Sequence, residues 1–113
     1  MDILEETTEV ALVLVPQGRL DSQTAPLLQE QLLGRIDAAP SVLIDCSRLD
    51  YVSSAGLRVF LMGAKRCQQS QRAFAICGLQ DTVKEVFEIS GFLSILSCYP
   101  DREQAQQAIS APG

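Results

Sequence analysis

The chain has 113 residues, of which 47% are hydrophobic and 20% are charged, a balance typical of a folded domain rather than a disordered segment. Its formal net charge is −5 and it contains no lysine- or arginine-rich run, which argues against nucleic acid as a partner. No apolar stretch reaches the ~18 residues of a membrane helix, and the first residues lack the pattern of a secretion signal. We therefore expect a cytoplasmic protein that does not bind membranes, with one domain over residues 1–110 and a tail over 111–113.

The first third of the chain predicts a hairpin followed by a helix. Residues 10–15 are apolar and rich in valine and leucine, as in a strand covered on both faces. Residues 3–7 are expected to pair with this strand as an edge strand, through a turn around residues 8 and 9. Asp21 or Ser22 then starts a helix, because either side chain can accept a hydrogen bond from a free backbone N–H. The apolar positions of this helix recur at helical spacing to about residue 38: Ala25, Leu28, Leu32 and Ile36.

The rest of the chain alternates between strands and helices. Residues 42–44 and 73–77 predict two more buried strands, separated by a loop through Asp50 and Tyr51 and by a helix that starts near Ser53. Further helices are expected over residues 81–90 and from Asp101 onward, with a short strand at 95–98 between them. The side chains expected to point inward from the second and third helices are Leu57, Phe60, Leu61, Ala64, Val83, Val86 and Phe87.

This order of elements predicts an α/β fold. We expect a mostly parallel central sheet of about five strands, with an N-terminal antiparallel hairpin and about four flanking helices. In open sheets of this kind, functional groups gather at the carboxyl ends of the strands, where loops lead into helices. Three segments are expected at that edge: residues 18–22, 50–57 and 77–79.

The four cysteines are not spaced like ligands of a metal ion. They form no C-x-x-C pair, and the chain has no histidine, so neither a zinc site nor any other metal is expected. The glycines form neither G-x-G-x-x-G nor a P-loop, and no cofactor is predicted. We expect reduced, structural cysteines, most of them in apolar or amphipathic segments: Cys46, Cys67, Cys77 and Cys98.

Two serines at the start of the second helix are the most informative feature of the sequence. Ser53 and Ser54 are followed by the small residues Ala55 and Gly56. One interpretation is that a serine simply caps the helix. The other is a regulated phosphoserine, since a phosphate would add about −1.5 to −2 charges beside free N–H groups and the positive end of the helix dipole. The two are compatible, because one serine can cap the helix while its neighbour stays free.

Three aspartates could suggest an enzyme that uses paired acids or magnesium. Asp21 is a natural helix cap, however, and Asp45 and Asp50 are common turn residues at strand ends. The chain also lacks histidine and any obvious pair of nucleophile and base, so the sequence gives little support to catalysis. We therefore expect a binding protein and not an enzyme.

Several segments, taken together, resemble the STAS domain of anti-sigma factor antagonists. The most specific is the serine-serine-alanine-glycine-leucine block at residues 53–57. Weaker matches flank it in the same order: Gly18-Arg19-Leu20-Asp21, Leu43-Ile44-Asp45-Cys46-Ser47, Tyr51-Val52, Arg58-Val59, Gly78-Leu79 and residues 86–92. The resemblance covers essentially the whole chain and implies a STAS-like sheet flanked by helices.

The resemblance also implies a partner switch. In this family an unmodified antagonist binds an anti-sigma factor, often a serine kinase of the histidine-kinase-like ATPase type, and so frees a sigma factor or other client. Phosphorylation of one serine at the start of the second helix breaks the complex, and a PP2C-type phosphatase restores it. Carried onto this chain, the phosphorylated residue is Ser54, with Ser53 in reserve.

The chain departs from some relatives, because Ser53 stands where they have aspartate and Ala55 carries no hydroxyl. One alternative is therefore a STAS adaptor that scaffolds a signalling complex without being phosphorylated. A receiver-like domain phosphorylated on Asp45 is a weaker alternative, since the acidic cluster and lysine of such domains are missing. Within the partner-binding edge, the small residues are expected to leave room for the partner, and Leu57 to pack mainly inside. The residues of that edge are Asp21, Ser22, Thr24, Ser53, Ser54, Ala55, Gly56, Leu57 and Arg58.

Overall fold

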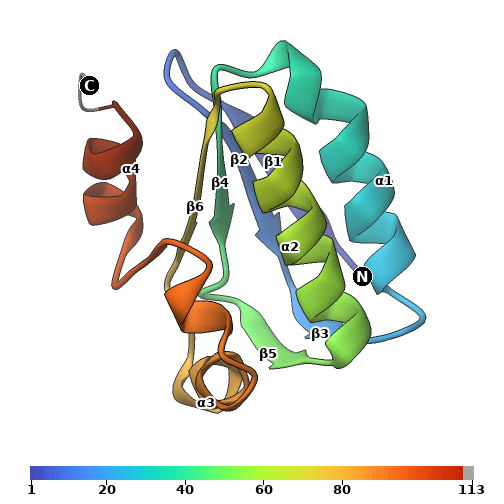
Figure 1. The fold of residues 1–113 in the computed structure, drawn as a ribbon. Coiled ribbons are helices and arrows are strands. Elements are labelled where there is room, and N and C mark those ends of the chain that lie inside the picture. The colour runs from blue at the N-terminus through green and yellow to red at the C-terminus, as the bar shows by residue number, and fades with distance from the viewer. Residues whose placement is uncertain (111–113) are drawn as a thin grey trace.

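A computed structural model describes residues 1–110; the expected tail at 111–113 lies outside the described residues. Its main sheet has five strands in the order β1-β2-β4-β6-β7 (Figure 1). Strands β1 and β2 are antiparallel, and the other neighbouring pairs are parallel. The predicted α/β fold with its N-terminal hairpin is thus confirmed. The strands are β1 (Ile3–Thr7), β2 (Leu12–Pro16), β4 (Ser41–Asp45), β6 (Ala73–Cys77) and β7 (Cys98–Tyr99).

Helices cover both faces of this sheet, which explains why β2 and β4 are buried along their whole length. The two faces of β2 belong to separate clusters: Leu12 and Leu14 face the larger one, and Val13 and Val15 the smaller one. Helices α1 and α2 lie side by side over the larger cluster, α3 packs below β5, and α4 lies on the opposite face (Figure 1). The helices are α1 (Ala25–Arg35), α2 (Ser54–Gln69), α3 (Asp81–Ile89) and α4 (Arg102–Ser110), with 3-10 turns η1 (Ile36–Ala38) and η2 (Phe92–Ser94).

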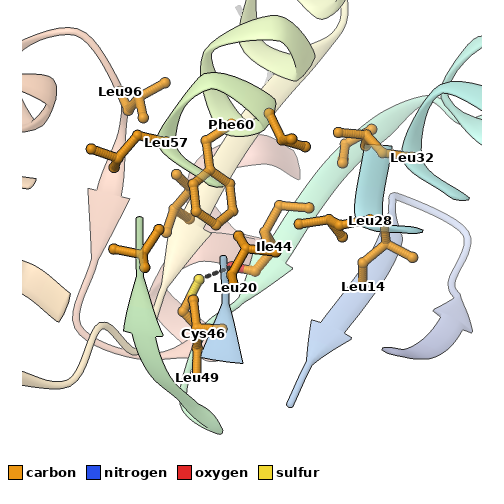
Figure 2. Close-up of a cluster of buried hydrophobic side chains, with 14 of the residues drawn as sticks. Leu14, Leu20, Leu28, Leu32, Ile44, Cys46, Leu49, Leu57, Phe60 and Leu96 are labelled. Atoms are coloured by element: carbon orange, nitrogen blue, oxygen red, sulfur yellow. Dashed lines mark hydrogen bonds between the residues drawn. The ribbon is translucent and has the colours of Figure 1, made fainter. Parts of the chain in front are cut away.

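The larger cluster is built around Phe60 of α2. Figure 2 shows this ring reaching into a group that includes Leu20, Ile44 and Cys46. The ring of Phe87 from α3 lies 5.6 Å from that of Phe60, so the second and third helices share one core. Of the inward positions expected on α2, Leu57 and Phe60 are buried, whereas Leu61 and Ala64 are only half-buried. The buried side of α2 comprises Gly56, Leu57, Val59, Phe60, Gly63 and Cys67.

A second, two-stranded parallel sheet was not predicted. It pairs β3 (Gly18–Leu20) with β5 (Leu49–Val52), where the sequence indicated a loop through Asp50 and Tyr51. The guanidinium of Arg19 lies 4.2 Å from the centre of the Tyr51 ring. Both strands are short and contain exposed residues beside buried ones, and each is stabilised by a partner about thirty residues away. The hydrophobic pattern of one short segment does not predict a pairing of this kind.

The largest differences from the predicted boundaries concern the start of α1 and the position of the last strand. Helix α1 begins at Ala25 and not at Asp21 or Ser22, because Asp21 closes a separate turn before the helix. The last strand lies at Cys98–Tyr99 and not at 95–98. The side chain of Ile95 is 61% exposed and its N–H closes the 3-10 turn η2, so this residue cannot begin a buried strand.

Helix α4 is fastened to the sheet by an ion-pair cluster. Arg102 Nη2 lies 2.8 Å from Asp45 Oδ2 at the end of β4, and Arg102 Nη1 lies 2.6 Å from Glu6 Oε2 of β1. Burial alone would raise the pKa of Asp45, but the hydrogen bond from the Ser47 N–H and the contact with Arg102 hold the pKa below its usual value. Asp101 accepts a hydrogen bond from the Gln104 N–H, which confirms its predicted role as the cap of this helix.

The four cysteines are free thiols inside or beside the core. Cys46, Cys67 and Cys77 are buried, and Cys98 is half-buried. Burial raises the pKa of Cys46 well above its usual value, that of Cys77 to about 12, and those of Cys67 and Cys98 to about 11. They therefore pack as small hydrophobic side chains, as expected. Over residues 1–110, none of the helices combines the length and the apolar character needed to cross a bilayer.

Candidate functional site: the amino-terminal edge of helix α2

Helix α2 starts at the edge where the two small strands end. The Ser53 N–H donates to the carbonyl oxygen of Leu20 at 2.8 Å, which ties the end of β3 to the residue before the helix. The Leu57 N–H then donates to the carbonyl oxygen of Ser53 at 2.9 Å and closes the first helical turn. The β3–β5 sheet thus fixes the position at which α2 begins.

The two serines have different positions at this edge. Ser53 has an extended backbone and caps α2, since its Oγ accepts the N–H of Gly56 at 3.3 Å. Ser54 is the first residue of the helix, and its side chain is exposed. The first N–H groups of a helix have no partner within it, so those of Ser54 and Ala55 remain available to an anion. Of the two readings of the serines, capping applies to Ser53, and Ser54 is the free hydroxyl.

Gly56 serves the interior of the protein and does not open a space for a partner. It is buried, and a Cβ at this position would lie 2.8 Å from Leu20 Cδ2 and 2.8 Å from Val52 Cγ2. The absence of a side chain lets α2 approach β3 and β5 closely. The expectation that Gly56 leaves room for a partner is therefore wrong. Leu57 is 5% exposed and packs inside, as expected.

The segment before α1 lies beside this edge, with its polar groups largely satisfied. Asp21 Oδ1 accepts the N–H groups of Gln23 at 3.0 Å and Thr24 at 3.1 Å. These two backbone hydrogen bonds hold the pKa of Asp21 below its usual value. The Thr24 hydroxyl donates to the carbonyl oxygen of Arg19 at 2.7 Å. Asp21 and Thr24 therefore shape the loop, and Ser22 is the exposed side chain that it presents.

A shallow groove of about 140 Å³ runs between the starts of α1 and α2. It brings Ser22 of the loop next to Ala55 and Arg58 of α2, which confirms that these segments meet at one edge. Its lining residues are Ser22, Ala25, Pro26, Gln29, Ala55, Arg58, Val59 and Met62. Five of these lining residues were not expected at this edge, because only the contact between α1 and α2 brings them next to the start of α2: Ala25, Pro26, Gln29, Val59 and Met62.

Arg58 is the charged residue of this groove, and it is free. Its side chain is exposed, and within residues 1–110 it makes no hydrogen bond or ion pair. Arg19 differs, since its guanidinium stacks on Tyr51. The candidate site thus combines an exposed hydroxyl, two open N–H groups and one uncommitted cation along the first turn of α2.

Asp45 belongs to a different part of the molecule. It is 7% exposed and points toward α4, where Arg102 and the Ser47 N–H occupy its oxygens. A carboxylate engaged in this way is poorly placed as a phosphoacceptor, which weakens the receiver-like alternative. Among the described residues, no three histidine, cysteine, aspartate or glutamate side chains are grouped so that they could hold a metal ion.

Sequence comparisons identify relatives along nearly the full length of the chain. It is 41% identical over 109 residues to BtrV of Bordetella bronchiseptica, a protein assigned as an anti-sigma factor antagonist, covering 96% of this chain and 94% of BtrV. It is 31% identical over 97 residues to the anti-sigma-B factor antagonist of Listeria monocytogenes, covering 85% of this chain and 84% of the relative.

A solved structure shares the fold at lower identity. The anti-sigma factor antagonist SpoIIAA of Bacillus, in its unphosphorylated form, superposes with a TM-score of 0.81 at 17% identity, covering 99% of this chain and 100% of SpoIIAA. Its phosphorylated form superposes with a TM-score of 0.73, covering 95% and 99%. The STAS domain family matches residues 3–105, which include every element from β1 to the first turn of α4. The chain therefore belongs to the STAS domain family.

Proposed function

We propose that this protein is an anti-sigma factor antagonist that acts in the cytoplasm as a phosphorylation-controlled partner switch. The observation that carries the proposal is a structural difference between two adjacent serines. Ser53 caps α2, whereas Ser54, the first residue of the helix, presents an exposed hydroxyl. A group can therefore be added to Ser54 without removing a hydrogen bond of the fold. The role is one of binding and not of catalysis.

The named relatives support this assignment. BtrV and the Listeria protein are both named as antagonists of anti-sigma factors, and SpoIIAA has been solved with and without phosphate. We infer that the partner is an anti-sigma factor, and that this partner is a serine kinase of the histidine-kinase-like ATPase type. In the switch, the γ-phosphoryl group of ATP passes to Ser54 Oγ, the hydroxyl proton goes to a base of the kinase, and ADP leaves. A PP2C-type phosphatase adds water to the phosphoserine and releases inorganic phosphate, which restores the hydroxyl.

The phosphate would act on binding through charge and desolvation. The proposed partner-binding edge comprises Asp21, Ser22, Thr24, Ser53, Ser54, Ala55 and Arg58, with Gly56 and Leu57 supporting it from inside. A dianion on Ser54 that is buried against a partner loses its water and meets any acidic group there, at a cost of about 2–5 kcal/mol. This cost is large enough to separate a complex of micromolar affinity.

One observation favours a second function. Ala55, the residue directly before Gly56, carries no hydroxyl, so one candidate position for modification is absent. A STAS adaptor that scaffolds a signalling complex would use the same groove and would never be phosphorylated. The two functions differ in two measurable properties: whether the partner phosphorylates Ser54, and whether binding responds to charge at Ser54.

The experiment begins with a pull-down from the native cytoplasm, using the unmodified chain as bait and measuring its intact mass before and after phosphatase treatment. The retained ATPase is purified, tested for phosphorylation of the bait, and titrated by calorimetry. Ser54→Ala is expected to bind but resist modification, and Ser54→Asp to bind at least about ten-fold more weakly. Ser97→Asp is the control, because it adds the same charge at an exposed serine directly before β7, outside the groove. Equal affinities of the wild type and Ser54→Asp would favour the adaptor and reject the switch.

A further inference from the structure

We propose that Arg58 is the internal counter-ion of a phosphate on Ser54, so that phosphorylation withdraws this cation from the groove while it adds its own negative charge. The biological setting of this inference rests on the proposed function. The pairing itself is a property of the isolated chain and can be measured without any partner.

The geometry of α2 brings the two side chains together. Ser54 and Arg58 are four residues apart, so their Cβ atoms are neighbours on one face of the helix, about 5–6 Å apart. Side chains in a helix lean toward its N-terminus. The long side chain of Arg58 therefore extends over the turn that begins with Ser54. Both side chains are exposed, and neither has to leave the core to meet the other.

Arg58 is also available, which most other arginines are not. Arg35 lies 2.7 Å from Glu5, Arg66 is paired with Asp37, and Arg102 with Asp45. Arg72 donates to two carbonyl oxygens beside η1. Arg58 has no such contact within the described residues, so a phosphate would meet no competing carboxylate.

The surroundings of Ser54 complete the pairing. The open N–H groups of Ser54 and Ala55 and the positive end of the helix dipole favour negative charge at this point. A guanidinium can donate two parallel hydrogen bonds to phosphate oxygens, which a lysine cannot. The phosphate would thus be held between the start of the helix and Arg58, close to the protein surface.

The consequence for binding follows from the composition of the groove. Among its lining residues, all of which are described, Arg58 alone is charged. In the unmodified protein this cation is free to bind a carboxylate of the partner. Once the phosphate has captured Arg58, the partner loses that contact and faces a dianion. A single modification then removes an attraction and adds a repulsion.

The test uses the full chain with phosphoserine incorporated at position 54, and follows the phosphate by ³¹P NMR as the pH is varied. Arg58→Gln should make the second acid dissociation constant of the phosphate smaller by about two-fold or more, since the dianion loses its partner. Lys65→Gln is the matched control: it removes one positive charge from an exposed position on the same helix, eleven residues further on. It should change the constant by clearly less than Arg58→Gln. Arg58→Lys should restore part of the effect.

Equal changes in Arg58→Gln and Lys65→Gln would show a general charge effect and overturn the pairing. That result would leave the proposed switch untouched, because the loss of partner binding in Ser54→Asp is measured separately. In a calorimetric titration with the kinase partner, Arg58→Gln should weaken the unmodified complex and should also reduce the further loss caused by phosphate. A phosphate effect of unchanged size in Arg58→Gln would overturn the proposal that capture of Arg58 contributes to release.

Discussion

The hydroxyl of Ser53 lies 3.3 Å from the backbone nitrogen of Gly56 and accepts its N–H. This hydrogen bond makes Ser53 the cap of α2 and predicts a difference between two adjacent serines. Ser53→Ala should lower the free energy of unfolding by about 1 kcal/mol, because the Gly56 N–H loses its acceptor. Ser54→Ala should change it by less than about 0.5 kcal/mol, since the Ser54 side chain is exposed. Urea denaturation of both variants provides the measurement, and equal losses would contradict the assignment of the cap.

The close approach of α2 to the small sheet predicts the effect of filling Gly56. Alanine favours helix, but its Cβ would lie 2.8 Å from buried atoms of Leu20 and Val52. Gly56→Ala should therefore lower the free energy of unfolding by about 1–3 kcal/mol. Gly34→Ala is the matched control, because Gly34 lies in α1 with no atom within 4 Å of the added Cβ. This variant should gain about 0.5–1 kcal/mol, and a loss of the same size in both would reject steric contact as the cause.

The sequence indicated most of this fold because its main strands are local apolar runs. The segments that became β2, β4 and β6 need no partner to be recognised, since every central position is apolar. The strands β3 and β5 contain exposed Arg19 and Tyr51 and are stabilised by pairing with each other. Their existence depends on a tertiary contact, which the hydrophobic pattern of one segment does not contain.

The ion pair between Asp45 and Arg102 predicts a dependence of stability on pH. The pKa of Asp45 is lowered in the folded protein from its usual 3.8, so the contribution of this carboxylate is complete above about pH 5 and is lost as the pH falls through the lower folded value. Near neutral pH, Asp45→Asn should lower the free energy of unfolding by about 1–3 kcal/mol, because a buried charged contact is lost. The difference from wild type should shrink on acidification.

Denaturation at a series of pH values gives this difference directly. Asp37→Asn serves as the comparison, since Asp37 forms its ion pair with Arg66 at an exposed position. Its effect should be much smaller at every pH and sensitive to salt. A constant difference between wild type and Asp45→Asn down to about pH 3 would contradict the lowered pKa.

The cysteines predict a protein that resists alkylation while folded. Burial raises the pKa of Cys98 to about 11 and that of Cys77 to about 12, so the reactive thiolate is scarce at neutral pH. Iodoacetamide should modify the native chain slowly, and Cys98 should react first because it is only half-buried. In concentrated urea all four thiols should react. Peptide mass mapping after short exposures orders the sites, and early labelling of Cys46 would contradict its burial in the larger cluster.

The candidate site was only partly predictable, for a related reason. The pattern of small and hydroxylated residues located the start of α2, but either serine could have capped it. Only the geometry assigns the hydrogen bond to Ser53 and turns Gly56 toward Leu20. The position of Arg58 beside Ser22 depends on the contact between α1 and α2, and no spacing within one segment reports it.

The small sheet of β3 and β5 means that the surface at the start of α2 is formed by chain segments some thirty positions apart. A short synthetic peptide copied from residues 50–60 would lack Leu20 and the strand that carries it, and would have nothing to fix the angle of its first helical turn. An enzyme that reads this edge must therefore recognise the folded molecule. Such an enzyme would not recognise newly made or damaged copies of the protein until β3 had paired with β5.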